Sequence, residues 1–402
     1  MTRQVRTQAN NPFRPGAGAV PDVWVGRAGL LPTHDERRWD RLHGHYTAGT
    51  VFIGPSGIGK SVLVNRFAQH AQRAGDVVLP PVRVAKRSDP VAQLAAVVHA
   101  AAQQVANSGS VVDGLEALLE RIHVVGFKGV QFAVENASIA NPHLVVRDGL
   151  VKLASTLARE NAARPAERQR VVVVRLDELQ NADNEQRSKL LSALGDVLEH
   201  EEPVGEHTSV HLPVVLYVTG LPDLLNRATN VDTFRRRFDT VPLGTFSDAE
   251  VVNALLTTPL PDGVRVDGDA ADAFAGIVAG DPYLFQLVGR RAWNASGGPS
   301  ISMDDVREAD EGTYGERLRT VEAASGDIPP AEAEVLDTIY ELADARGQVR
   351  GADVASKLGR TAPQIATAAQ RLERRAAIRR ERGLWRIEHR LLHRYRTTGD
   401  IV

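Results

Sequence analysis

The sequence predicts an α/β protein with a parallel sheet at its centre, a region of helices after the sheet, and a C-terminal module of helices and a hairpin. Apolar runs of strand length recur at 51–53, 171–176 and 212–219, and stretches with helical spacing separate them. From residue 247 the pattern is helical only, and it returns to strands near the C-terminus. The length of 402 residues is too great for one core, so we expect two or three domains.

Residues 1–22 are rich in Pro and Gly and have no apolar period, which predicts an extended arm. A helical stretch from Leu30 to about Gly44 then leads into the first strand. We expect the α/β core to cover residues 23–246, a helical lid to cover 247–328, and the C-terminal module to cover 329–402.

A glycine-rich turn follows the first strand, and an amphipathic helix from Val62 to about Ala74 follows the turn. The turn fits the pattern G-x-x-x-x-G-K-[ST] in full, in the strand–turn–helix context that this phosphate-binding loop requires. Glycines allow backbone conformations closed to other residues, and the first helical turn adds its unpaired N–H groups. We therefore predict ATP binding by the loop residues Gly54, Pro55, Ser56, Gly57, Ile58, Gly59, Lys60, Ser61 and Val62.

Two residues of this loop have specific predicted roles. Lys60 is expected to reach the β- and γ-phosphates, and the Ser61 hydroxyl is expected to ligate Mg²⁺. The alternative is a glycine-rich turn that binds nothing, and the acidic pair that follows a later strand argues against it.

That pair stands behind the strongest strand signal of the chain. Four consecutive valines at 171–174 predict a strand buried on both faces of a parallel sheet, and Asp177 and Glu178 arrive where this strand ends. Ligands of open α/β sheets bind at the carboxyl ends of the strands. We predict that Asp177 holds Mg²⁺, mostly through water, and that Glu178 orients and polarises the water that attacks ATP. The alternative is an acidic turn without a chemical role.

Thr219 ends the next buried strand, at 212–219. Its hydroxyl is expected to contact the γ-phosphate or the attacking water, or alternatively to cap the helix predicted at 224–238. That helix ends in three arginines, which form either a solvated face or a group that reaches the nucleotide of a neighbouring subunit. These candidates are Arg235, Arg236 and Arg237.

The remaining elements follow from spacing and from Pro and Gly positions. We expect strands at 77–84 and 241–243, helices at 90–106, 114–122 and 144–162, and a hairpin at 124–134. In the lid we expect helices at 248–257, 268–279, 282–295 and 303–321. Pro282 suits the first turn of the third lid helix.

In the C-terminal module, helices are expected from Pro330, from Gly351 and after Thr361, followed by two short strands within 377–388. Three helices and a basic hairpin describe a winged helix-turn-helix. Residues 346–396 hold fourteen Arg and Lys against four Asp and Glu, in a chain of net charge −2. We therefore expect double-stranded DNA as a partner, bound mainly through its phosphates. The alternative is a winged helix that contacts proteins.

Composition excludes several classes of protein. No apolar run approaches the eighteen or so residues that a membrane span needs, and the polar N-terminus has no signal-peptide core. We therefore expect a cytoplasmic protein without a membrane partner. Because the chain has no cysteine, disulfides, thiolate metal sites and cysteine nucleophiles are excluded.

With these motifs assembled, the chain resembles bacterial AAA+ ATP-binding proteins of the origin-recognition-like group, which carry a C-terminal winged helix. The resemblance covers nearly the whole length, including Asn11-Pro-Phe13, Val25-Gly-Arg27, the phosphate loop, 176–180, 218–222 and Gly280-Asp-Pro-Tyr283. It implies a P-loop NTPase of the AAA+ (ASCE) class that hydrolyses ATP, works as a homo-oligomer and changes shape with its nucleotide.

Two features bear on whether the chain belongs to this group or to a second family. Gly280-Asp-Pro282 resembles the G-x-P lid motif of STAND signalling ATPases, which makes Pro282 a candidate nucleotide contact, whereas AAA+ lids often carry an arginine there. STAND proteins tend to have an acidic residue after Gly-Arg, but Ala28 follows here. The hypotheses are an AAA+ ATPase whose nucleotide state controls oligomerisation and binding of DNA or an unknown protein, a STAND-like signalling or defence switch, and a nucleotide-gated scaffold.

Overall fold

The structure is a computed structural model that describes residues 5–16, 18–27, 29–108, 110–111, 141–205, 208–222, 224, 236–344, 346–375, 377–381 and 383–401. The chain forms two compact units. The sheet unit contains Gly29–Ile53 and Leu63–Pro242, and the helical unit contains Met1–Ala28, Gly54–Val62 and Leu243–Val402. The predicted helix 114–122, the hairpin 124–134 and most of the helix 224–238 lie outside the described residues. The division into four segments stays a prediction.

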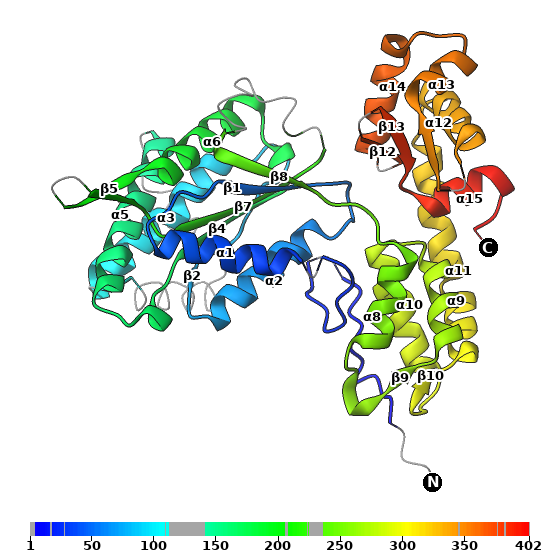
Figure 1. Cartoon of the computed structure of the whole chain (residues 1–402), viewed down its shortest axis with the longest axis horizontal. Helices are drawn as coiled ribbons and strands as arrows, with labels where there is room; N and C mark the ends of the chain where they lie inside the picture. The colour runs from blue at the N-terminus through cyan, green and yellow to red at the C-terminus, as the bar shows by residue number, and fades with distance from the viewer. Residues whose placement is uncertain are drawn as a thin grey trace. The chain divides into compact units, whose positions relative to one another are not determined.

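A parallel sheet forms the centre of the sheet unit, which confirms the predicted fold class (Figure 1). The strand order is β2-β4-β7-β1-β8, with β3 also paired to β4, and all of these pairings are parallel. The single strand predicted at 77–84 is two short strands, because Pro80 and Pro81 have no N–H group for the ladder. The strands are β1 (Gly49–Ile53), β2 (Val77–Val78), β3 (Val82–Arg83), β4 (Val172–Asp177), β7 (Val214–Gly220) and β8 (Phe238–Pro242).

Helices cover both faces of this sheet because alternate residues of each strand point to opposite sides. On one face, Phe67 packs against Phe52 and Tyr217, with ring centroids 5.7 and 5.0 Å away. On the other face, residues such as Val51 and Val174 join a buried cluster with three helices. The helices are α1 (Leu30–Leu42) and α2 (Lys60–Arg73), then α3 (Pro90–Ser108), α5 (Pro142–Ala162) and α6 (Asn184–Glu199). Strands β5 (Glu201–Gly205) and β6 (Thr208–His211) pair after α6.

His34 of α1 lies fully buried within the aromatic face. Its Nδ1 atom is 2.5 Å from the Tyr217 hydroxyl, and its ring stacks on Phe67 with a centroid distance of 5.7 Å. Within the described part of the chain, its Nε2 atom has no hydrogen-bond partner. Burial disfavours the imidazolium and lowers the pKa of His34 to about 4.

We predict that acid destabilises the sheet unit through His34. Between pH 6.5 and about 4 the unfolded chain binds a proton at His34 that the folded chain does not bind. The free energy of unfolding therefore decreases as the pH is lowered through this window. From pH 7 to about pH 5 the loss is about 2 kcal/mol. Urea unfolding of His34→Asn is expected to show a pH dependence smaller by that amount, whereas the exposed-site control His43→Gln keeps it. Equal pH dependence in wild type and His34→Asn would contradict the prediction.

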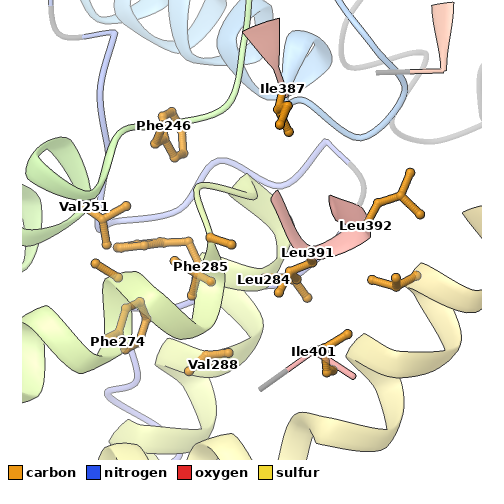
Figure 2. Packing of buried hydrophobic residues seen from close by; sticks show 14 of the residues in the cluster. Phe246, Val251, Phe274, Leu284, Phe285, Val288, Ile387, Leu391, Leu392 and Ile401 are labelled. Atoms are coloured by element: carbon orange, nitrogen blue, oxygen red, sulfur yellow. The ribbon is translucent and has the colours of Figure 1, made fainter. Parts of the chain in front are cut away.

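The helical unit contains two sets of helices that share one hydrophobic core. Figure 2 shows Leu284 and Phe285 of α10 in the same cluster as Leu391 of α15. The first set is α8 (Asp248–Thr257), α9 (Gly268–Val278), α10 (Pro282–Ala295) and α11 (Met303–Gly326), with paired strands β9 (Arg265–Val266) and β10 (Ser300–Ile301). The second set is α12 (Pro330–Leu342), α13 (Gly351–Lys357), α14 (Ala362–Arg374) and α15 (Arg390–Thr398). An antiparallel sheet of order β11-β13-β12 completes it, from β11 (Gln348–Arg350), β12 (Ile378–Glu381) and β13 (Leu384–Ile387).

The N-terminal segment has no helix or strand in its described residues, 5–16 and 18–27, yet it packs closely on the lid helices. The Arg6 side chain is buried, and its guanidinium donates to the Asp305 carboxylate at 2.9 Å and to the Ala292 carbonyl at 2.9 Å. Phe13 fills a notch at Gly289, where an added Cβ atom would lie 2.3 Å from its ring. We call residues 5–16 and 18–25 the strap. No helix in the described part of the chain combines the length and apolar character of a membrane span.

Candidate nucleotide-binding site

The ends of three parallel strands meet at one edge of the sheet. Ile53, the last residue of β1, is in register with Gly220 of β7, and Val218 of β7 is in register with Leu176 of β4. The phosphate loop starts directly after Ile53, and Asp177 ends β4. The register therefore puts Ile53, Thr219 and the acidic pair at the same sheet edge, the edge at which ligands bind in this fold class.

The glycines of the loop are required by its backbone. An added Cβ atom at Gly54 would lie 2.7 Å from the carbonyl oxygen of Leu243. Gly57 and Gly59 have φ angles of 81° and 84°, which side-chain-bearing residues rarely adopt. Only glycine fits well at these three positions, because Gly54 has no room for a Cβ atom and Gly57 and Gly59 have positive φ angles.

Lys60 is the first residue of α2, and its side chain turns back over the loop. The Nζ atom donates to the carbonyl oxygens of Gly54 at 2.8 Å and Pro55 at 2.6 Å, and the residue is 4% exposed. An ammonium held inside a glycine-rich turn, beside the N–H groups at a helix start, is the donor set that a triphosphate needs. The residues present therefore fit ATP.

Arg27 also contacts the phosphate loop, and its sequence position alone predicts no role for it. Its Nη2 atom donates to the carbonyl oxygens of Ile58 at 2.6 Å and Gly244 at 3.3 Å, and Nη1 lies 3.5 Å from the Gly59 carbonyl oxygen. The guanidinium also sits 5.1 Å from the centroid of the Phe246 ring. Burial lowers the pKa of Arg27 to about 10, so it stays charged at neutral pH. The only sequence signal for this residue was the Gly26-Arg27 pair.

Thr219 links the two acidic residues. Its hydroxyl donates to Asp177 Oδ1 at 2.5 Å and accepts from the Glu178 N–H at 3.0 Å. Asp177 and Ser61 both offer oxygen atoms, the ligand type that Mg²⁺ prefers. The contact of Thr219 with a phosphate or with water, and its alternative role as a helix cap, stay predictions.

Glu178 has an unusual backbone conformation for a residue with a side chain, with φ 62° and ψ 38°. It precedes a short 3₁₀ turn, Leu179–Asn181, and the Gln180 side-chain amide donates to its carboxylate. A left-handed residue costs roughly 1 kcal/mol or more, and such residues often occur at functional positions. The left-handed backbone and the hydrogen bond from Gln180 together hold the Glu178 carboxylate, which is predicted to orient water, in one position.

The three candidate arginines have different surroundings. Arg235 lies outside the described residues. Arg237 is bound within its own chain, to Asp196 at 2.9 Å and to Glu199 at 2.6 Å. The Arg236 side chain is exposed, and its carbonyl oxygen accepts a hydrogen bond from the Tyr46 hydroxyl at 3.2 Å. Arg236 is thus the described member of the trio that is oriented toward solvent.

The lid motif lies close to the phosphate loop within the helical unit. An added Cβ atom at Gly59 would be 3.9 Å from the Pro282 Cβ atom. Asp281 caps α10 by accepting from the N–H groups of Tyr283 at 2.8 Å and Leu284 at 2.9 Å, which places Pro282 at the start of the helix. This neighbourhood agrees with the prediction that Pro282 contacts the nucleotide, and that contact stays a prediction.

Most arginines of the C-terminal module pair with carboxylates. Residues 329–402 hold ten Asp and Glu against fourteen Arg and Lys, so acidic residues of α12 offset much of the surplus in 346–396. Arg346 and Arg386 are exposed and make no ion pair with another described residue. The described arginine pairs are Arg350–Asp353, Arg360–Glu334, Arg371–Glu332, Arg375–Glu332, Arg379–Glu388, Arg380–Glu373, Arg390–Asp248 and Arg396–Asp337.

The chain matches one protein-family model over part of its length, and its fold is similar to those of solved proteins. Residues 24–205 match the family model described as AAA ATPase domain. No curated protein sequence matches the chain. A Walker-type ATPase of Pyrococcus abyssi has 13% identity and a TM-score of 0.54, with 90% of this chain and 93% of that chain covered. At this identity the likeness concerns the fold alone.

Two further solved structures are similar at lower TM-scores. The Orc1 protein of Aeropyrum pernix, solved in complex with DNA, has 15% identity and a TM-score of 0.43, covering 95% of this chain and 94% of that chain. The RuvB Holliday junction branch migration motor of Thermotoga maritima has 12% identity and a TM-score of 0.40, covering 96% and 100%.

Proposed function

We propose that this chain, whose residues 24–205 match the family model described as AAA ATPase domain, binds and hydrolyses ATP with Mg²⁺ and uses its nucleotide state to control assembly and partner binding. The observation that carries this proposal is the phosphate loop, with Lys60 held inside the glycine turn at the start of α2. Bound Mg²⁺ would neutralise phosphate charge. Ser61 and Asp177 would hold the ion, Lys60 would hold the phosphates, and Glu178 would orient water.

The direct test uses the whole chain of 402 residues. Isothermal titration with ATP in the presence of Mg²⁺ is expected to give saturable binding, and phosphate release is expected to stop when EDTA removes the metal. Protein that neither binds ATP nor releases phosphate would overturn the proposal.

The C-terminal module is the proposed DNA-binding part of the chain. Arg346 and Arg386 are exposed without a described ion pair, and Arg350, Lys357 and Arg360 have exposed pairs of the kind that contribute little. These five cations can turn to phosphates at small cost. By contrast, Arg371, Arg375 and Arg379 hold buried carboxylates, which disfavours their release.

We therefore predict weak duplex binding that falls steeply with salt. Each phosphate contact contributes about −0.9 to the slope of log K against log salt, so five contacts lower K by roughly 2.7 log units between about 50 and 200 mM. Fluorescence anisotropy with the whole chain of 402 residues measures this slope. Arg386→Ala should make it shallower by about 0.9, and Arg14→Ala, which removes an exposed arginine of the strap, should not change it. Binding that ignores salt would contradict the prediction.

We also predict that ATP hydrolysis depends on assembly through Arg236. Since Arg237 is bound within its own chain, the exposed Arg236 is the better candidate to reach a neighbouring subunit's nucleotide. Specific activity is expected to rise with protein concentration, and Arg236→Ala should remove that rise. Activity that stays constant over dilution through the assembly range would count against an arginine acting in trans.

A second candidate function, a STAND-like switch, is favoured by contacts of the C-terminal module with Asp248 of the lid and with Thr245, which lies just before the lid. Arg390 makes a two-point ion pair with Asp248 at 2.6 and 3.0 Å, and Glu388 accepts from the Thr245 N–H at 3.3 Å. Through these contacts the C-terminal module binds another part of its own chain, as a module that docks on proteins would. A protein that retains one bound nucleotide through purification, turns it over less than once, and binds no DNA would promote this candidate.

A further inference from the structure

The guanidinium of Arg27 contacts two successive peptide groups of the phosphate loop. The carbonyl oxygen of Ile58 belongs to the peptide that carries the Gly59 N–H, and the carbonyl oxygen of Gly59 belongs to the peptide that carries the Lys60 N–H. In a trans peptide the C=O and N–H bonds point to opposite sides. Because Arg27 nitrogens lie 2.6 Å and 3.5 Å from these oxygens, Arg27 is on the carbonyl side of both peptides, and both N–H groups point away from it.

These two N–H groups lie where the glycine turn becomes the first turn of α2, the place at which anions bind a loop of this type. A cation behind the peptides also polarises them and strengthens both N–H groups as donors. Arg27 can thus influence a bound phosphate without touching it.

Arg27 is held firmly in this position. Its φ angle is 55°, a left-handed conformation that a non-glycine residue keeps only when its surroundings impose it. Next to it, an added Cβ atom at Gly26 would lie 3.0 Å from the Phe246 ring, so the backbone approaches that ring closely. Val23 and Val25 are buried in the core of the helical unit.

The strap continues this anchoring along α10. The Gln286 side chain donates to the Val23 carbonyl oxygen at 3.2 Å and accepts from the Arg14 N–H at 2.9 Å. Asn11 donates to the Arg290 carbonyl oxygen at 3.1 Å, and Phe13 occupies the Gly289 notch. A shift of α10 would therefore move the strap and, with it, the residue that holds the loop peptides.

We propose that Arg27 is a positioning residue for the nucleotide phosphates, which acts through the Ile58–Gly59 and Gly59–Lys60 peptides and which the strap connects to lid helix α10. This inference rests on the proposed ATP binding. In this proposal the Asn11-Pro-Phe13 and Gly26-Arg27 motifs act together, so that a movement of lid helix α10 changes the position of the phosphate-loop peptides.

The test compares ligands with and without phosphates. Arg27→Met keeps an unbranched side chain but loses all donors, and its affinity for ATP and for tripolyphosphate is expected to fall by the same factor, at least about tenfold. Adenosine, which has no phosphate, should bind both proteins equally. Arg27→Lys keeps the charge without the two-pronged fork and should restore part of the loss. Arg307→Met, a change at an exposed arginine of α11, should bind like wild type.

The connection through the strap is tested by a double-mutant cycle. Phe13→Ala is expected to weaken tripolyphosphate binding in the wild-type background and to have no effect in Arg27→Met, because the second change has already removed the link. Independent, additive losses would overturn the strap's role. Unchanged tripolyphosphate affinity in Arg27→Met, or an equal loss for adenosine, would overturn the role of Arg27. Wild-type protein that binds neither ATP nor tripolyphosphate would overturn the proposed function itself.

Discussion

Replacement of Lys60 by alanine is expected to weaken ATP binding by a factor of roughly 30 to 4,000. The ammonium is 4% exposed, and truncating one partner of a buried, hydrogen-bonded charge pair costs about 2–5 kcal/mol. The loss should be large for ATP and for ADP, because both ligands place a β-phosphate at the loop. Isothermal titration of the purified variant measures it.

The structure suggests a matched control for this change. Lys60 also donates to the Gly54 and Pro55 carbonyl oxygens, so its removal takes two hydrogen bonds from the loop itself. Lys60→Arg keeps the charge but brings a larger, planar group into the turn, whereas Lys189→Ala removes a lysine that pairs with Glu185 on the exposed surface. Lys189→Ala should bind ATP normally. Unchanged ATP affinity in Lys60→Ala would remove the phosphate loop from the site.

The phosphate loop could be predicted because its chemistry is local. Gly57 and Gly59 have positive φ angles, and Lys60 begins the next helix. All the residues that the loop conformation requires therefore lie within one short stretch of sequence. The valine run before Asp177 was equally informative, since only a strand buried on both faces needs it. These two signals identified the sheet and the ends of its strands.

Arg27 and Arg6 could not be given their roles from sequence, because those roles depend on contacts between distant segments. Arg27 meets carbonyl oxygens 31 and 217 residues further along the chain, and Arg6 meets Asp305 after 299 residues. The same limit applies to charge. A count over 346–396 described a basic surface, but Glu332 of α12, outside that window, holds Arg371 and Arg375.

Helix α6 is a different case, because no helix is predicted at 184–199 although its local signals are clear. Asp183 accepts from the Gln186 N–H as a side-chain cap, and buried Leu190, Leu194 and Leu198 follow at helical spacing. The fold class follows from the strands and not from this helix, so the sheet prediction holds without it.

Glu178→Gln is expected to bind ATP as wild type does and to release phosphate at least about 100-fold more slowly. Positioned acid–base groups contribute typically 10²–10⁴-fold to rate, and the substitution removes the carboxylate while it keeps the side chain's length and shape. The backbone of Glu178 is fixed by the Thr219 hydroxyl and by its left-handed conformation, so the glutamine side chain should start from the same place. The loss should therefore appear in kcat and leave the affinity for ATP unchanged.

Two comparisons make this result specific to Glu178. Glu185→Gln changes an exposed glutamate of α6 that pairs with Lys189, and it should hydrolyse ATP at the wild-type rate. Gln180→Ala removes the amide that donates to the Glu178 carboxylate, so it should alter the rate while Glu178 remains in place. Single-turnover phosphate release separates the chemical step from binding and product release. A wild-type rate for Glu178→Gln in that experiment would show that another group orients the attacking water, and Asp177, which also bonds the Thr219 hydroxyl, would then be the next carboxylate to change.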